Sequence, residues 1–143
     1  MAIKRDKVDA IFSKLIRERA DWSCERCGKH FPSRGGKEAM GLHCSHLYSR
    51  RHTRTRHDPD NAVAHCFTCH QWLGENPVDF ANWIEDYIGV GRLEILSEKA
   101  HSECKMTKKD KEAQYQHLKA EYSRMMALRE EGQQGRIEFT GFL

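Results

Sequence analysis

The chain has 143 residues, of which 38% are hydrophobic and 31% charged, a composition that fits one domain with a helical appendage. No stretch offers the roughly 18 apolar residues that a membrane span needs, and the first residues lack the apolar core of a secretory signal. We therefore expect a cytoplasmic protein with no membrane contact. Residues 1–60 carry 14 Lys/Arg against 8 Asp/Glu, whereas residues 61–143 carry 10 against 13. A polyanionic partner should bind the basic first half, the alternative being a solvated charged surface.

Apolar residues at helical spacing predict a first helix over residues 6–19. Gly-Gly at positions 35 and 36 then separates a tight turn from a strand within residues 41–48, and a second strand is expected at 62–65. Further short helices are predicted at residues 69–73, ending before Gly74, and at residues 92–101.

Two later helices have recognisable ends. Asn76 followed by Pro77 predicts the start of a helix that ends at Gly89. Thr107 followed by Asp110 predicts the N-terminal cap of a long helix that reaches about residue 131. The long helix carries an apolar stripe that packs against the domain or a second copy, so the oligomeric state stays open: Tyr115, Leu118, Tyr122 and Met125.

Four of the six cysteines form two C-x-x-C pairs, Cys24/Cys27 and Cys66/Cys69. In a reducing compartment such pairs are typical metal ligands, and four thiolates match a tetrahedral structural zinc. The 38 residues between the pairs would form a large loop closed by the zinc. The alternative is four buried thiols without a metal.

The zinc loop and its end are rich in histidines. The combination Cys24-x-x-Cys27, His46, Asn61 and Cys66-x-x-Cys69-His70 resembles the signature of the HNH (ββα-metal) endonucleases, with Asn61 nine positions before His70. Within that superfamily, the segment SHLYSRRHTRTRHDPDNAVAHCFTCHQWLGENP looks closest to phage recombination nucleases of the Rap/NinG type.

The resemblance implies three catalytic residues. His46 would be the general base, because imidazole titrates near neutral pH. His70 would hold a catalytic Mg²⁺ or Mn²⁺, and Asn61 would fix the loop and orient the base. Ser45 stands where many HNH enzymes have a second metal ligand and is a poor ligand itself. The second ligand stays open among four residues: His43, Asp58, Asp60 and His65.

Arginines fill the segment between His46 and Asn61, and in an HNH core this loop lies beside the cleft. Arginine suits bidentate phosphate binding, so four residues are predicted to bind DNA: Arg50, Arg51, Arg54 and Arg56. A solvated loop is the alternative, and a transition-state role for Arg56 is a further one.

These observations predict an α+β fold, a zinc-stapled ββα-metal core with an N-terminal helix and several C-terminal helices. We expect residues 1–22 to pack on a core of residues 23–75, residues 76–131 to be helical, and residues 132–143 to form a flexible tail. The expected function is metal-dependent cleavage of DNA phosphodiesters in phage recombination or repair, in the host cytoplasm if the protein is phage-encoded. The first alternative is a non-catalytic zinc module that binds DNA or a recombination protein. The second is an adaptor that works through its long helix.

Overall fold

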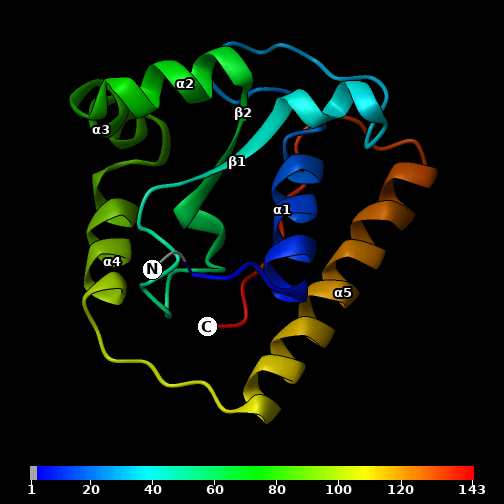
Figure 1. Cartoon of the computed structure of the whole chain (residues 1–143). Helices are drawn as coiled ribbons and strands as arrows, with labels where there is room; N and C mark the ends of the chain where they lie inside the picture. Colours follow the sequence, from blue (N-terminus) through cyan, green and yellow to red (C-terminus); the bar gives the residue numbers. More distant parts are fainter. Residues whose placement is uncertain (1–2) are drawn as a thin grey trace.

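The computed structural model describes residues 3–143 and has the expected mixed α+β architecture (Figure 1). Its elements, in chain order, are α1 (Lys7–Arg19), η1 (Lys37–Gly41), β1 (Leu42–His46), η2 (Pro59–Asn61), β2 (Ala62–Cys66), α2 (Phe67–Glu75), α3 (Pro77–Ile88), α4 (Val90–Ala100) and α5 (Lys108–Glu130). Within the described residues, no helix combines the length and the apolar character that crossing a membrane requires.

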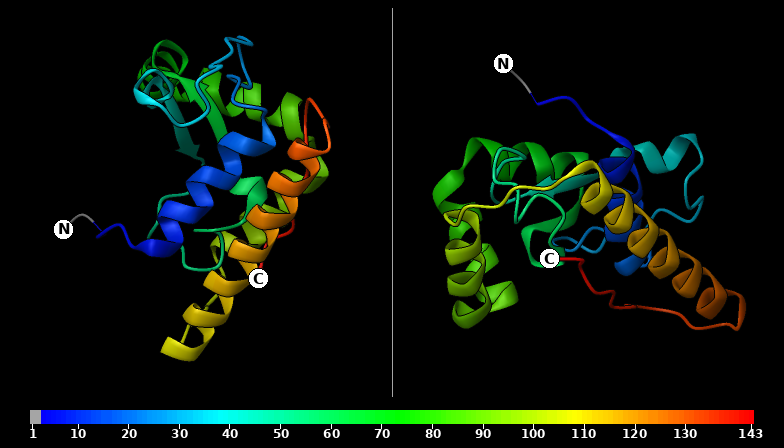
Figure 2. Two further views of the ribbon diagram at one scale, coloured as in Figure 1. Left: turned by 90° about the vertical axis from the view of Figure 1, so that its right-hand side faces the viewer. Right: turned by 90° about the horizontal axis from the view of Figure 1, so that it is seen from below.

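Helices α1 and α5 lie side by side and build one flank of the core (Figures 1 and 2). Asp6 caps α1 through reciprocal hydrogen bonds with Asp9, and Thr107 caps α5 in the same way. Leu118 and Met125 of α5 are fully buried against this flank. The apolar stripe of α5 therefore packs against the rest of its own domain, which was the first of the two alternatives predicted from the sequence.

The two strands form one antiparallel ribbon in which His43 is paired with His65 and His46 with Ala62. Successive side chains on a strand point to opposite faces. Ser45 accordingly contacts His70 on α2, whereas His46 lies against Phe12 of α1. The ribbon thus lies between α1 and α2, and the alternation decides which helix each β1 side chain meets.

The helix boundaries agree with the sequence in part. Helix α3 begins at Pro77 and ends before Gly89, whose φ of 89° suits a residue without a Cβ. Helix α2 is longer than predicted, because it begins directly after Cys66 and continues through Gly74. The short 3₁₀ helix η1 was not predicted from the sequence.

The last twelve residues have no regular secondary structure, yet they are not the loose tail expected from the sequence. Ile137 and Phe139 are buried in the core cluster. The Ile137 amide donates to the carbonyl of Arg19 over 3.2 Å, and the Phe139 ring meets Phe12 edge-on with 6.2 Å between centroids. The segment runs back from the end of α5 toward the core (Figure 2). Burial of two alternating apolar side chains explains why it is held.

Candidate active site and metal centre

The four cysteines of the two C-x-x-C pairs meet in one cluster. All four Sγ atoms lie within 4.8 Å of one another: Cys24, Cys27, Cys66 and Cys69. The first pair lies in the turn after α1, where Gly28 adopts a φ of 82°, and the second pair joins β2 to α2. Four sulfur ligands in this arrangement fit a tetrahedral structural zinc. Such a metal would staple the end of α1 to the start of α2.

Hydrogen bonds to sulfur support metal binding by the cluster. The amides of Cys27 and Cys69 donate to Cys24 Sγ and Cys66 Sγ, each over 3.5 Å, and Arg26 donates to Cys69 Sγ over 3.5 Å. Burial opposes ionisation of Cys24, but the backbone N–H groups around it lower its pKa to about 7. Because the thiolate is the ligand form of cysteine, these donors favour the metal-binding state of Cys24, whereas burial and the neighbouring thiols raise the pKa of Cys69 in the metal-free cluster.

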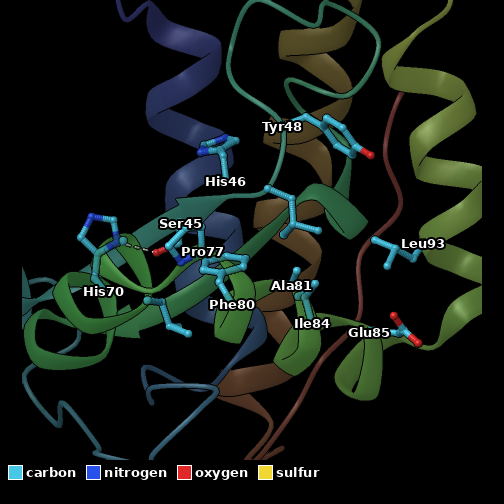
Figure 3. Close-up of a pocket in the computed structure, with 13 residues that line it drawn as sticks. Ser45, His46, Tyr48, His70, Pro77, Phe80, Ala81, Ile84, Glu85 and Leu93 are labelled. Carbon is cyan, nitrogen blue, oxygen red and sulfur yellow. Dashed lines mark hydrogen bonds between the residues drawn. The ribbon is translucent and has the colours of Figure 1, made fainter.

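His70 lies exposed on α2 directly after the last cysteine. Its Nδ1 is 2.7 Å from Ser45 Oγ (Figure 3). Its ring stacks on that of His43 with 4.8 Å between centroids and 5° between planes. His65 reaches the same hydroxyl through Nδ1 over 3.1 Å. His43, His65 and His70 therefore lie around Ser45. From the sequence, Ser45 was noted only as a poor metal ligand. Residues 43 and 45 point to the same face of β1, and His43 is paired with His65 on β2. This strand register could have indicated from the sequence that these side chains lie together.

The structure separates the four candidates for a second metal ligand. Asp58 pairs with Lys99 over 3.0 Å and Asp60 pairs with Arg92, so both carboxylates are engaged around η2. His65 is completely buried. Of the four, only His43 is both partly exposed and in ring contact with His70.

His46 ends β1 and faces α1. Its ring centroid is 5.9 Å from that of Phe12, and its buried Nε2 has no hydrogen-bond partner among the described residues. Burial lowers the pKa of His46 to about 4, and the positive charge of Arg50 adds to the shift. The imidazole is therefore neutral at pH 7, which is the state required of a proton acceptor.

His46 and His70 lie on different sides of β1 and are not in direct contact in Figure 3, but both line one cavity of about 510 Å³ between β1, α2 and α3. Ser45 contributes a third polar group. Glu85 is a further polar residue of the wall, and the rest of the wall is largely apolar: Leu47, Tyr48, Leu73, Gly74, Pro77, Phe80, Ala81, Ile84 and Leu93. Of the three residues predicted to be catalytic, His46 and His70 line this cavity and Asn61 does not.

Asn61 holds the loop between the strands. Its buried side chain accepts from the Tyr48 amide over 2.8 Å and donates to the carbonyls of Tyr48 and Thr55 over 3.0 and 2.9 Å. Its own carbonyl accepts from the Leu47 amide over 3.0 Å, directly after His46. Asn61 thus fixes the backbone on which His46 lies.

Replacement of Asn61 by aspartate should lower the melting temperature and loosen this loop. The substitution removes both N–H donors, so the Tyr48 carbonyl loses the partner shown for it at a cost of about 1–3 kcal/mol, while the Thr55 carbonyl keeps only the Asp58 amide. Amide hydrogen exchange should accelerate in residues 47–58 while α5 stays protected. Unchanged exchange in the loop would contradict this role of Asn61.

The four arginines predicted to bind DNA have different surroundings in the fold. Arg56 forms an ion pair with Asp9 of α1 over 2.6 Å, and Arg54 donates to the carbonyl of Glu103 over 3.3 Å. These two guanidinium groups tie the loop to its neighbours instead of lying open for phosphates. Arg50 lies 3.7 Å from Asp9, and Arg51 is exposed on the loop.

Two buried histidines should make stability depend on pH. Burial lowers the pKa of both His46 and His65 from 6.5 to about 4. Below pH 6.5 these two histidines are protonated in the unfolded chain but remain neutral in the folded protein. The free energy of unfolding therefore decreases as the pH falls from 6.5 toward 4. Each histidine should lower the free energy of unfolding by about 2 kcal/mol between pH 7 and pH 5.

Urea unfolding with zinc in excess measures this loss. The variant His65→Gln cannot take up the proton and should lose less stability over the same interval, which separates the histidine from the pH dependence of the thiolates. An equal loss in the variant and the parent protein would show that His65 does not contribute.

Comparison with known proteins locates the similarity in this region of the chain. No curated protein and no solved structure matches the sequence. A protein-family model described as HNH endonuclease matches residues 24–75. The matched segment holds all four clustered cysteines, both strands, α2 and the histidines around Ser45. The match supports the HNH superfamily for this segment, a group of proteins whose general activity is nuclease.

Proposed function

We propose that the protein is a metal-dependent endonuclease that hydrolyses DNA phosphodiester bonds, with a role in phage recombination or repair. The observation that carries the proposal is the placement of His70: exposed, fixed directly after the cysteine cluster, bonded to Ser45 and stacked on His43 at the rim of the cavity that His46 also lines. The recombination setting rests on the resemblance of residues 45–77 to Rap/NinG-type nucleases.

In this proposal, His70 and His43 hold the catalytic Mg²⁺ or Mn²⁺. The contact with Ser45 orients the His70 ring through Nδ1 and leaves Nε2 for the metal, as hydrogen bonds to the second ring nitrogen do in metal sites. A divalent cation bound there supplies positive charge against the charge that builds on the phosphate and the departing 3′ oxygen.

His46 is the proposed general base. Its neutral ring takes the proton of the attacking water at Nε2, the nitrogen that has no partner among the described residues. Asn61 positions His46 through the adjacent backbone. Cys24, Cys27, Cys66 and Cys69 hold the structural zinc, which keeps α2 and thus His70 in place.

The domain arrangement follows from these roles. We assign the catalytic core to residues 23–75, onto which residues 1–22 pack through α1. Residues 76–131 are largely helical, and α3 contributes one wall of the cavity.

One observation favours the alternative of a non-catalytic zinc module that binds DNA or a recombination protein. His46 is directed toward α1, whereas His70 contacts Ser45 on the other face of β1. Cleavage therefore depends on water reaching His46 Nε2 through the shared cavity, and a module that only binds DNA has no such requirement.

A nicking assay distinguishes the two functions. Purified full-length protein is incubated with supercoiled plasmid in the presence and absence of added Mg²⁺ or Mn²⁺. We expect nicked and linear DNA only with the added metal, and no product from His70→Ala under the same conditions. DNA binding without cleavage at any metal concentration would favour the zinc module.

A further inference from the structure

The cavity that Ser45 and His70 line is larger than a phosphate and a cation require. It has a volume of about 510 Å³ and extends from these two residues to Glu85 of α3 and Leu93 of α4, which lie at its other side in Figure 3. This volume falls in the range of about 300–1,000 Å³ that is usual for small-molecule sites. The metal-binding role proposed for His70 leaves most of this space without an occupant.

The lining of the cavity favours an uncharged and largely apolar occupant. Within residues 3–143, no lysine or arginine lines it, and Glu85 is its one acidic residue. Leu73 and Ile84 are almost completely buried in its wall. A second phosphate at the Glu85 side would meet a carboxylate and no lysine or arginine, whereas an apolar group would be stabilised by its removal from water.

Two aromatic side chains of the wall are held in place by neighbouring rings. The ring of Phe80 meets the buried His65 edge-on, with 6.0 Å between centroids. The ring of Tyr48 has edge-on contacts with His52 and His101, with 5.6 and 5.8 Å between centroids. Aromatic rings are the side chains on which nucleobases stack, and rings that are already held lose little further freedom when they do so.

The position of the cavity beside the candidate metal site limits what a substrate can place in it. A phosphodiester held at His70 carries a sugar and a base on each side, so a base is the apolar group that the substrate offers to the cavity. A base that is paired and stacked in a duplex can enter only after it is unpaired and unstacked, at a cost of a few kcal/mol. An unpaired nucleotide does not have this cost.

We propose that the cavity binds one unpaired nucleobase next to the scissile phosphate, so that the protein selects DNA with an unpaired nucleotide over fully paired DNA. The proposal rests on the proposed nuclease function and names the feature of DNA that the same site recognises. Tyr48 and Phe80 supply the aromatic surface for the base. Glu85, at the far side from His70, accepts a hydrogen bond from an N–H group on the edge of the base.

The affinity of the full-length protein for three short duplexes tests the base pocket. One duplex is fully paired, the second has a single bulged nucleotide, and the third has an abasic residue at the bulged position. Binding is measured without added divalent metal, so that no cleavage occurs. The protein should bind the bulged nucleotide roughly tenfold more tightly than the abasic bulge, because stacking on aromatic rings is lost with the base. The abasic duplex retains the bulged backbone, so the difference isolates the base.

Ala81→Phe should abolish this difference between the bulged and abasic duplexes. Ala81 lines the cavity from an exposed position on α3, so a larger side chain there fills the cavity without disturbing the buried core. Ala120→Phe is the matched control, because Ala120 is an exposed alanine on α5 and does not line the cavity. It should keep the tenfold difference.

Tyr48→Leu is a second variant, which removes an aromatic ring but keeps apolar bulk and the main-chain amide that donates to Asn61. It should reduce the difference, and melting curves of all variants establish that they fold. Equal affinities of the parent protein for the bulged and abasic duplexes would overturn the base pocket. A full tenfold difference in Ala81→Phe would also overturn it, because the base would then bind elsewhere.

The outcome is separable from that of the nuclease proposal. A parent protein that never nicks plasmid but binds the bulged nucleotide more tightly than the abasic bulge retains the base pocket and loses the nuclease function. A protein that cleaves DNA with added metal but binds these two duplexes equally keeps the nuclease function and loses the base pocket.

Discussion

Replacement of Cys66 by serine should unfold the core of this protein. Cys66 lies at the junction of β2 and α2, its sulfur accepts the Cys69 amide, and all four clustered sulfurs lie within 4.8 Å. A structural zinc contributes roughly 10–16 kcal/mol of apparent binding energy, whereas a whole domain is stable by only about 5–15 kcal/mol. Loss of one of four ligands should therefore abolish the cooperative melting transition. Metal analysis of the parent protein should find about one zinc per chain.

Cys104→Ser is the control for this prediction. Cys104 lies outside the cluster and is partly buried, so its replacement removes a thiol of the same chemistry without touching the metal ligands. Its melting curve and zinc content should match those of the parent protein. A zinc-free parent protein with an unchanged melting curve would refute the structural zinc.

Replacement of His46 by alanine should reduce DNA cleavage by roughly 10²–10⁴-fold, the usual contribution of a general base. Zinc content and DNA affinity should be retained. The melting temperature should fall by no more than the loss of one hydrogen bond with the Arg56 backbone and of the packing contact with Phe12, because Nε2 itself has no partner among the described residues. Single-turnover cleavage of a labelled duplex measures the effect.

His70→Ala should also abolish cleavage, but through loss of the catalytic ion. Raised Mn²⁺ should then restore part of the activity, whereas excess metal cannot replace a missing base in His46→Ala. One Mn²⁺ titration on both variants therefore separates the two roles. If His46→Ala cleaves as fast as the parent protein, His46 is not the base, and the zinc-module alternative becomes the better account.

Local patterns in the sequence were sufficient for the elements whose cause is local. The reciprocal cap at Thr107 and the glycine after α3 depend on residues a few positions apart, and they mark the start of α5 and the end of α3 in the structure. The two C-x-x-C pairs likewise predicted the sulfur cluster, because thiolates at that spacing have a strong chemical preference for one metal.

Partners that are distant in sequence were decided only by the tertiary structure. Arg56 resembles a phosphate ligand when its own loop is considered, but folding places it against Asp9, 47 positions earlier. The C-terminal segment has the composition of a tail, yet burial of Ile137 and Phe139 beside α1 holds it in the core. An ion pair or a buried apolar contact of this kind depends on which surfaces pack together in the folded protein. The local sequence pattern does not indicate which surfaces these are.

The candidate site shows the same division. The sequence by itself determined the ligand chemistry: four cysteines, a histidine after them, and a histidine at the end of a strand. Only the folded chain shows that Ser45 joins His70 to His65, that His43 stacks on His70, and that His46 faces the opposite side of β1. The physical reason is that strand register and the docking of α2 decide which side chains share a face, and both are set by packing across the whole core.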